Sequence, residues 1–197
     1  ALIVQMAKGV GATVIGTVAV LLTHATFSDS ALNAAVERRW LTLALLAGGA
    51  TLLTSSGGVI SQAVILSTGR VTGPSALDAA AQLLTQTAYG SRWLMREGWT
   101  LALLAILVWQ RRQVSVNRLM LSATLPLIGA IAVLQAMNGH ATSLTEASTV
   151  RIVADALHLL GASVWVGGLI ALGVAVVPLL RRGSTAAALG HLILRRF

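Results

Sequence analysis

The sequence has no cysteine and is poor in charged, acidic and aromatic residues. Without cysteine, neither a disulfide framework nor a thiolate metal site can form. Charged side chains make up 10% of the 197 residues, whereas soluble domains have about one quarter. Asp and Glu number 6 against 14 Lys and Arg, for a net charge of +8. No basic stretch is long or interleaved with aromatic residues, so this excess does not indicate nucleic-acid binding. Enzyme motifs are also missing: we find no nucleophile motif and no glycine-rich phosphate loop, and we predict no enzyme.

Hydrophobic residues dominate what is present. They account for 56% of the chain, and the mean hydropathy is +0.82. This composition predicts an all-α polytopic membrane protein, with one transmembrane domain over residues 1–197. A spanning helix needs about 20 mostly apolar residues. Five stretches qualify, at about residues 2–22, 40–66, 92–110, 119–137 and 150–180.

Two further segments lie outside these spans. Ser75–Ala88 follows the breakers Gly73 and Pro74, and we expect it to form a short helix at the membrane surface. Residues 186–197 resemble the start of a sixth span. We therefore expect the chain to be a fragment of a longer protein.

Basic residues around the spans predict their orientation. With the N-terminus outside, the cytoplasmic connections carry a net charge of +7 and the outer half of the protein only +1. An excess of Lys and Arg in cytoplasmic loops sets the orientation of membrane proteins, so we predict a bacterial inner-membrane protein with a periplasmic N-terminus. Trp40, Trp93 and Trp109 fall at predicted span ends, where indole rings prefer to lie. The cytoplasmic basic residues are Arg38, Arg39, Arg111, Arg112, Arg118, Arg181, Arg182, Arg195 and Arg196.

Small residues occur within two of the spans. Gly48, Gly49, Gly57 and Gly58 lie in the second span, and Gly167 lies in the fifth. Small side chains allow membrane helices to approach closely. We interpret these glycines as packing positions.

With this orientation, polar side chains of all five spans lie in their outer halves, and the inner halves are mainly apolar, with Thr13, Thr17, Thr42, Ser122 and Thr124 as weak exceptions. Lys8 lies in the first span, Arg96 and Glu97 lie in the third, and Asn138 ends the fourth. Ionisable residues inside a bilayer are costly and are candidates for function. The pattern predicts a polar pocket that opens outward and is closed below, with Lys8, Arg96 and Glu97 in it.

The fifth span carries three ionisable residues in register. Arg151, Asp155 and His158 are spaced i, i+4, i+7, which places them on one face of a helix. Asp155 could accept a hydrogen bond from one ring nitrogen of His158 and leave the other free to bind a metal, with Arg151 beside the carboxylate. In the alternative interpretation, the three form an ion pair and a buried histidine that tie helices together.

His140 and Met137 lie just after the fourth span, in Met137-Asn-Gly-His140. Imidazole and thioether together suit copper, and a thioether favours the cuprous ion. A solvated loop histidine and a packing methionine are the simpler alternatives.

Several segments resemble the copper-resistance protein D family, CopD. The similarity is carried by Gly139-His140-Ala141, by the block Ala154–Leu169 with its Asp-Ala-Leu-His and Trp-Val-Gly-Gly elements, by Tyr89–Arg96 and by Leu194–Phe197. The resemblance implies a multi-pass inner-membrane protein for copper uptake or resistance. It also implies that His140 and His158 match the histidine positions of the family, and that a periplasmic copper-binding CopC-like protein is a partner.

We therefore expect a CopD-like protein that binds copper at its periplasmic face. His140, His158 and Met137 would be the ligands, and Asp155 and Arg151 would orient them. Two alternatives stay open. One is a haem-binding electron carrier, because two histidines on adjacent helices can ligate iron. The other is a structural subunit of a larger membrane complex.

Overall fold

The computed structural model describes residues 11, 14–21, 30–68, 75–114, 116–138 and 149–180. Regular structure in these residues is entirely helical, as the composition predicts. Residues 14–21 are helical. The remaining helices are α2 (Ser30–Thr68), α3 (Ala76–Gln86), α4 (Ala88–Arg112), α5 (Arg118–Ser122), α6 (Thr124–Met137) and α7 (Thr149–Leu180).

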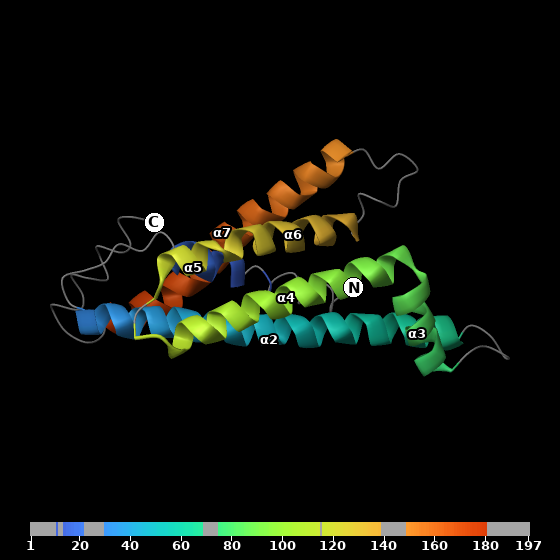
Figure 1. Cartoon of the computed structure of the whole chain (residues 1–197), viewed down its shortest axis with the longest axis horizontal. Helices are drawn as coiled ribbons and strands as arrows, with labels where there is room; N and C mark the ends of the chain where they lie inside the picture. The colour runs from blue at the N-terminus through green and yellow to red at the C-terminus, as the bar shows by residue number, and fades with distance from the viewer. Residues whose placement is uncertain are drawn as a thin grey trace.

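The long helices α2, α4 and α6 run side by side, and each reverses the direction of the one before (Figure 1). Helix α7 packs against α6 along its first half, then crosses the bundle and meets α2 near the start of α2 (Figure 1). The short helix α3 lies across the end of the bundle where α2 ends and α4 begins. We call this the α3 end.

Three helices in the described part of the chain are long and apolar enough to span a membrane. They cover Ala34–Thr68, Arg118–Met137 and Thr149–Val174. The sequence predicted five spans. Most of the first, residues 2–22, lies outside the described residues, and the predicted sixth span at 186–197 lies wholly outside them. The third is present as α4, whose 25 residues are long enough, but Arg92, Arg96 and Glu97 lower its hydropathy.

Helix α2 is longer than the second predicted span. It has 39 residues and begins at Ser30, ten residues before the predicted start. At about 1.5 Å per residue, it exceeds the hydrocarbon core of about 30 Å. The helix includes Glu37, Arg38 and Arg39, which lie outside the predicted span. Charged side chains make a segment unsuitable for lipid, but they do not break its helical hydrogen bonds.

The fourth predicted span is interrupted at Ala123, where α5 ends and α6 begins. Pro126 explains the position of the break. A proline has no backbone N–H and its ring clashes with the carbonyl four residues earlier, here that of Ser122.

The short helix predicted at residues 75–88 is present as α3, and its position at the membrane surface stays a prediction. Ser75 is its N-cap, and the backbone N–H of Asp78 donates to the Ser75 hydroxyl at 3.2 Å. Leu77 remains 83% exposed. Helix α4 follows after one residue, and Gly90 permits this tight turn because a Cβ there would lie 2.2 Å from the carbonyl oxygen of Leu83.

The apolar core lies at the end of the bundle opposite to α3. Residues of 14–21 and of α2, α4, α5, α6 and α7 form it together. Trp40 is fully buried there, and its indole N–H donates to the carbonyl oxygen of Ala171 at 2.8 Å. Trp40 therefore lies within the bundle and not on its outer surface, and its depth in a membrane stays a prediction.

Only some of the glycines are contact points. A Cβ on Gly16 would lie 2.3 Å from the backbone of Gly167 and Gly168, so residue 16 and α7 are in backbone contact. Gly48 packs against Leu104 in the same way, whereas a Cβ on Gly49 or Gly58 would meet nothing within 4 Å.

Candidate functional site

A cavity of about 200 Å³ lies in the half of the bundle nearest to α3. Every long helix contributes to its wall: the second half of α2, the first half of α4, the end of α6 and the first half of α7. Polar and apolar side chains alternate around it. The lining residues are Gly11, Ile15, Thr51, Thr54, Ser55, Gly58, Gln62, Tyr89, Trp93, Arg96, Thr100, Ile131, Ala132, Gln135, Asn138, Leu159 and Ser163.

An ion pair between neighbouring residues of α4 lies at this cavity. The Arg96 guanidinium donates from Nη2 at 2.5 Å and from Nε at 3.0 Å to Oε1 of Glu97. Its Nη1 donates at 2.5 Å to Oε1 of Gln135 on α6. Consecutive residues of a helix point in different directions. The pair forms because the long arginine side chain bends toward the next residue, Glu97. The same guanidinium group links α4 to α6 through Gln135.

The same pair is bonded to α2 through Ser55. The Ser55 hydroxyl donates to Oε1 of Glu97 at 2.7 Å, and its oxygen accepts from the indole N–H of Trp93 at 2.8 Å and from Nη2 of Arg96. Glu97 is 8% exposed and Ser55 is equally buried. Charged groups this far from water need such partners, so the network holds α2, α4 and α6 at a fixed separation around the cavity.

The network leaves polar atoms without partners. All hydrogen bonds to Glu97 in the described structure go to Oε1, and its buried Oε2 has no partner. Asn138 also lines the cavity. Its Oδ1 and Nδ2 are both buried and have no hydrogen-bond partner in the described structure. Buried polar atoms of this kind are usually satisfied by water. The cavity is large enough for several water molecules, each needing about 10–15 Å³ of accessible volume.

The end of α6 is anchored at the α3 end of the bundle. Nη1 of Arg92 donates at 3.0 Å to the carbonyl oxygen of Met137, the last residue of α6. Met137 is half-buried, and Met95 of α4 is 56% exposed. His140 comes three residues after Met137 in the sequence. Both His140 and Lys8 lie outside the described residues.

The face of α7 that carries Arg151, Asp155 and His158 does not line the cavity. Leu159 and Ser163 line it instead, while Ala156 packs against Ala132 and Ala136 of α6. His158 comes two residues after Ala156, which is about 200° around the helix, and it is exposed.

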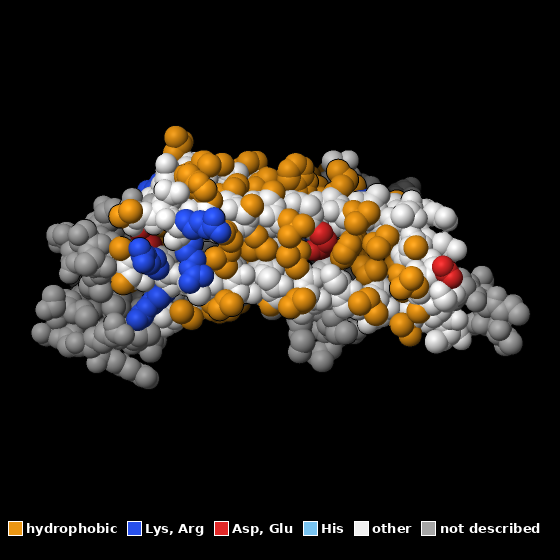
Figure 2. Space-filling model, turned by 60° about the horizontal axis from the view of Figure 1, so that its bottom comes forward, with side chains coloured by type: hydrophobic (Ala, Val, Ile, Leu, Met, Phe, Trp, Pro, Cys, Tyr) orange, Lys and Arg blue, Asp and Glu red, His pale blue; other side chains and the backbone are white. Residues whose placement is uncertain are grey.

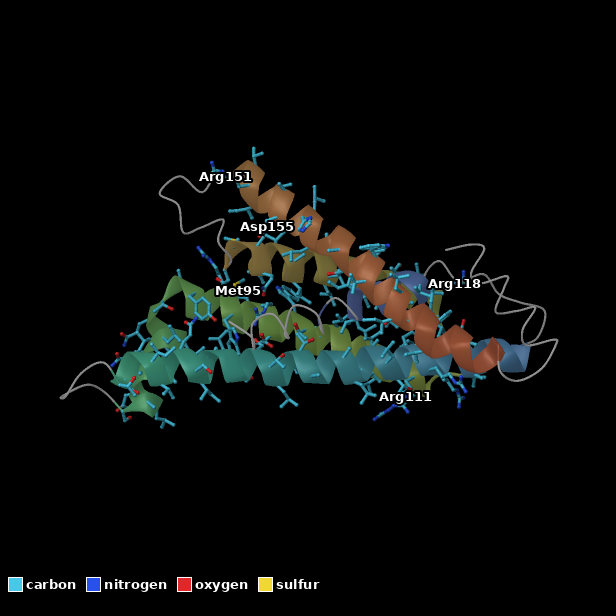
Figure 3. All side chains as sticks on the ribbon, turned by 180° about the vertical axis from the view of Figure 1, so that it is seen from behind. Met95, Arg111, Arg118, Arg151 and Asp155 are labelled. Carbon is cyan, nitrogen blue, oxygen red and sulfur yellow. The ribbon has the colours of Figure 1, made fainter. Side chains whose placement is uncertain are left out.

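Arg151 and Asp155 lie near the start of α7, at the opposite end of the molecule from Arg111 and Arg118 (Figure 3). Arg151 is exposed and Asp155 is half-buried. No hydrogen bond joins Asp155 to His158 in the part of the chain that the structure describes. The predicted orienting role of Arg151 and Asp155 stays a prediction.

The donor atoms around the cavity are hard ones. The described lining residues supply amide, hydroxyl and guanidinium groups, with no thioether or imidazole among them. Nowhere among the described residues do three or more His, Cys, Asp or Glu side chains gather as a metal-binding group. Cuprous copper prefers softer donors than the described part of the cavity wall offers.

The sequence identified part of this site and missed part. Arg96 and Asn138 line the cavity, and Glu97 is bonded to Arg96 beside it, whereas the predicted outward opening of the pocket stays a prediction. Thr100 and Ser163 could not be singled out beforehand, because single hydroxyl residues are common in membrane helices. Trp93 was interpreted as an interfacial residue, and its indole is instead bonded within the network.

Long apolar helices around a polar cavity, with an ion pair buried beside it, define a helical membrane protein with an internal polar site. The chain matches the family described as "Copper resistance protein D-like, N-terminal domain" over residues 7–149, well over half of its length, and it belongs to that family. It is thus a copper-related membrane protein. Comparison with curated proteins and with solved structures finds no match.

Proposed function

We propose that this protein binds copper at the α3 end of its bundle, at the periplasmic face of the bacterial inner membrane, and serves copper transport or homeostasis. Membership of the copper-resistance family carries the assignment to copper. The cavity supports the location, because it gathers the polar groups of four helices at one end of an otherwise apolar bundle.

The orientation follows from charge. The end opposite to α3 carries Arg38, Arg39, Arg111, Arg112 and Arg118, and the positive-inside rule assigns that end to the cytoplasm. The α3 end then faces the periplasm. In this arrangement α4 is a span as well, with its charged first half facing the cavity and bonded to α2 and α6.

The proposed copper ligands are Met137, His140 and His158. Arg92 holds the backbone of Met137 at the α3 end, and His140 follows Met137 by three residues in the sequence. His158 lies on the α7 face turned away from the cavity. One shared site therefore requires the chain around His140 to cross to that face, and two separate sites are the other arrangement.

Copper stoichiometry of the purified chain tests the proposal and separates these arrangements. We expect His140→Ala to lose copper, with Met137→Leu weakening its retention. If His140 and His158 share one ion, each single variant loses it completely; if they do not, each loses a fraction and the double variant loses all. His191→Ala, on the predicted cytoplasmic side, is the matched control. Unchanged copper content in the double histidine variant would refute the proposal.

A second candidate function rests on the uncovered face of α7. Leu157, Trp165 and Leu169 are at least half exposed on it, and Asp155 and His158 lie among them. A carboxylate facing lipid is costly, so a protein partner would stabilise this face. The partner would be the other subunits of a larger complex or a periplasmic CopC-like protein. If the role is structural, the protein co-purifies with its partner in the His140→Ala and His158→Ala variants as well. Co-purification that depends on the histidines would exclude the purely structural role.

A further inference from the structure

The end of the molecule opposite to α3 gathers arginines on a surface that is otherwise apolar. Arg38 and Arg39 lie early in α2, Arg111 and Arg112 end α4, and Arg118 begins α5. Basic side chains are concentrated toward one end of the face shown in Figure 2, while hydrophobic side chains cover its middle. We call these five residues the arginine end.

The structure holds these helices in contact. Arg38 and Arg111 line one small hollow, together with Glu37 and Val116. The side chain of Gln110 fixes the turn between α4 and α5, because Nε2 donates to the Asn117 carbonyl at 2.6 Å and Oε1 accepts from the Asn117 N–H at 3.0 Å. Arg111 and Arg112 are therefore presented at a defined place beside α2.

Among the described residues, no acidic partner is found for four of the five guanidinium groups. The side chains of Arg38, Arg39, Arg111 and Arg112 make no ion pair or hydrogen bond with any residue that the structure describes, and Arg38, Arg111 and Arg112 are exposed. Glu37 is the one carboxylate in this part of the described chain. The arginine end therefore carries a concentrated positive charge.

The neighbouring surface is apolar. Val114 is 89% exposed and Leu119 is 84% exposed, and both lie between or beside the arginines in the α4–α5 connection. Trp109, about one helical turn before Arg112, is 41% exposed. Apolar side chains next to guanidinium groups match the boundary between acyl chains and headgroups of a bilayer, where aromatic rings also prefer to lie.

We propose that the arginine end binds the phosphate of an anionic phospholipid headgroup. A guanidinium group binds phosphate oxygens with two parallel hydrogen bonds, and the arginines from two helices can share one headgroup. The hollow between Arg38 and Arg111 has a volume of about 10 Å³, enough for one water molecule at most. The headgroup therefore lies over the surface with its acyl chains along Val114 and Leu119.

The test measures lipid binding to the intact purified chain by native mass spectrometry, with phosphatidylglycerol and phosphatidylcholine as probes. We expect phosphatidylglycerol to bind more tightly. Each basic residue near an anionic membrane surface contributes a factor of about five in affinity. The variant Arg111→Gln/Arg112→Gln should therefore bind phosphatidylglycerol about 25-fold more weakly, with phosphatidylcholine binding unchanged.

Two variants control for folding and for position. Arg111→Lys/Arg112→Lys keeps the charge and should stay within about fivefold of the parent chain. Arg151→Gln, at the other end, should change binding little. Equal loss in the lysine or the Arg151 variant, equal binding of the two lipids, or displacement of the lipid by inorganic phosphate would each overturn the proposal.

Discussion

The ion pair of Arg96 and Glu97 gives the sharpest test of how this bundle is stabilised. Both side chains are mostly buried, at 14% and 10% exposure, and each is the other's charged partner. Replacing Glu97 with leucine leaves a buried guanidinium without a counter-charge, and replacing Arg96 with methionine leaves a buried carboxylate. Removal of one partner of a buried pair costs about 3–5 kcal/mol. We expect each single variant to lose unfolding free energy in this range.

The double variant Arg96→Met/Glu97→Leu should lose much less. It removes both charges, and only neutral groups lose partners: Oε1 of Gln135 loses its donor and the Ser55 hydroxyl loses its acceptor. Each such loss costs about 1 kcal/mol, because the net value of a neutral hydrogen bond is of that size. The expected total is about 2 kcal/mol, far below the sum of the two single losses.

Unfolding in mixed detergent micelles, followed by tryptophan fluorescence, measures this cycle. The Trp93 indole is bonded to Ser55, so its emission reports on the network directly. Gln82→Ala, exposed on α3, is a control that should stay within about 0.5 kcal/mol of the parent chain. If the double variant loses as much as the two single variants together, the pair is not coupled and our account of the cavity wall is wrong.

Two further predictions concern helix packing. Gly16→Val should strongly destabilise the chain, because its Cβ would meet the α7 backbone at 2.3 Å, whereas Gly49→Ala should be neutral or slightly stabilising because the added methyl group meets nothing. The same unfolding assay distinguishes them, and equal effects would contradict the contact. Trp40→Phe removes the hydrogen bond to the Ala171 carbonyl and should cost about 1 kcal/mol or more, since the smaller ring also leaves a void. A variant as stable as the parent chain would show that this bond contributes nothing.

Helix positions could be predicted because length and hydropathy determine them. The start and end of α7 agree with the fifth predicted span within one residue, and Ser75 gave the start of α3. The start of α2 could not be predicted from hydropathy. Glu37, Arg38 and Arg39 make its first turns unsuitable for lipid, but these residue types are compatible with a helix.

Which polar residues share an end of the bundle can be read from span order, but the rotation of each helix cannot. Arg96 and Asn138 both line the cavity, whereas the depth of the polar residues in a membrane stays a prediction. For α7, the spacing of Asp155 and His158 predicts a shared face, but does not indicate where that face points. Contacts of alanines decide this, since Ala156 packs on Ala132 and Ala136. Such contacts are not visible in a sequence with alanine on every side of the helix.

The two faces of α7 should therefore differ in their access to water, and this can be measured at neighbouring positions. Ser163 is buried at the cavity, while Ala162 is exposed on the face that carries His158, at nearly the same depth. The chain has no native cysteine, so a single introduced thiol is the only one that reacts. A membrane-impermeant thiol reagent attacks the thiolate, which forms in water and not in lipid.

In reconstituted vesicles, we expect this reagent to label Ser163→Cys and to leave Ala162→Cys unlabelled. Unpartnered polar atoms at the cavity favour water there, whereas Ala162 lies one turn before the exposed apolar ring of Trp165. Labelling in detergent, where both thiols are accessible, confirms that each variant is reactive. The reverse pattern in vesicles would place water on the His158 face, and would make that face, rather than the cavity, the route by which an ion reaches the protein.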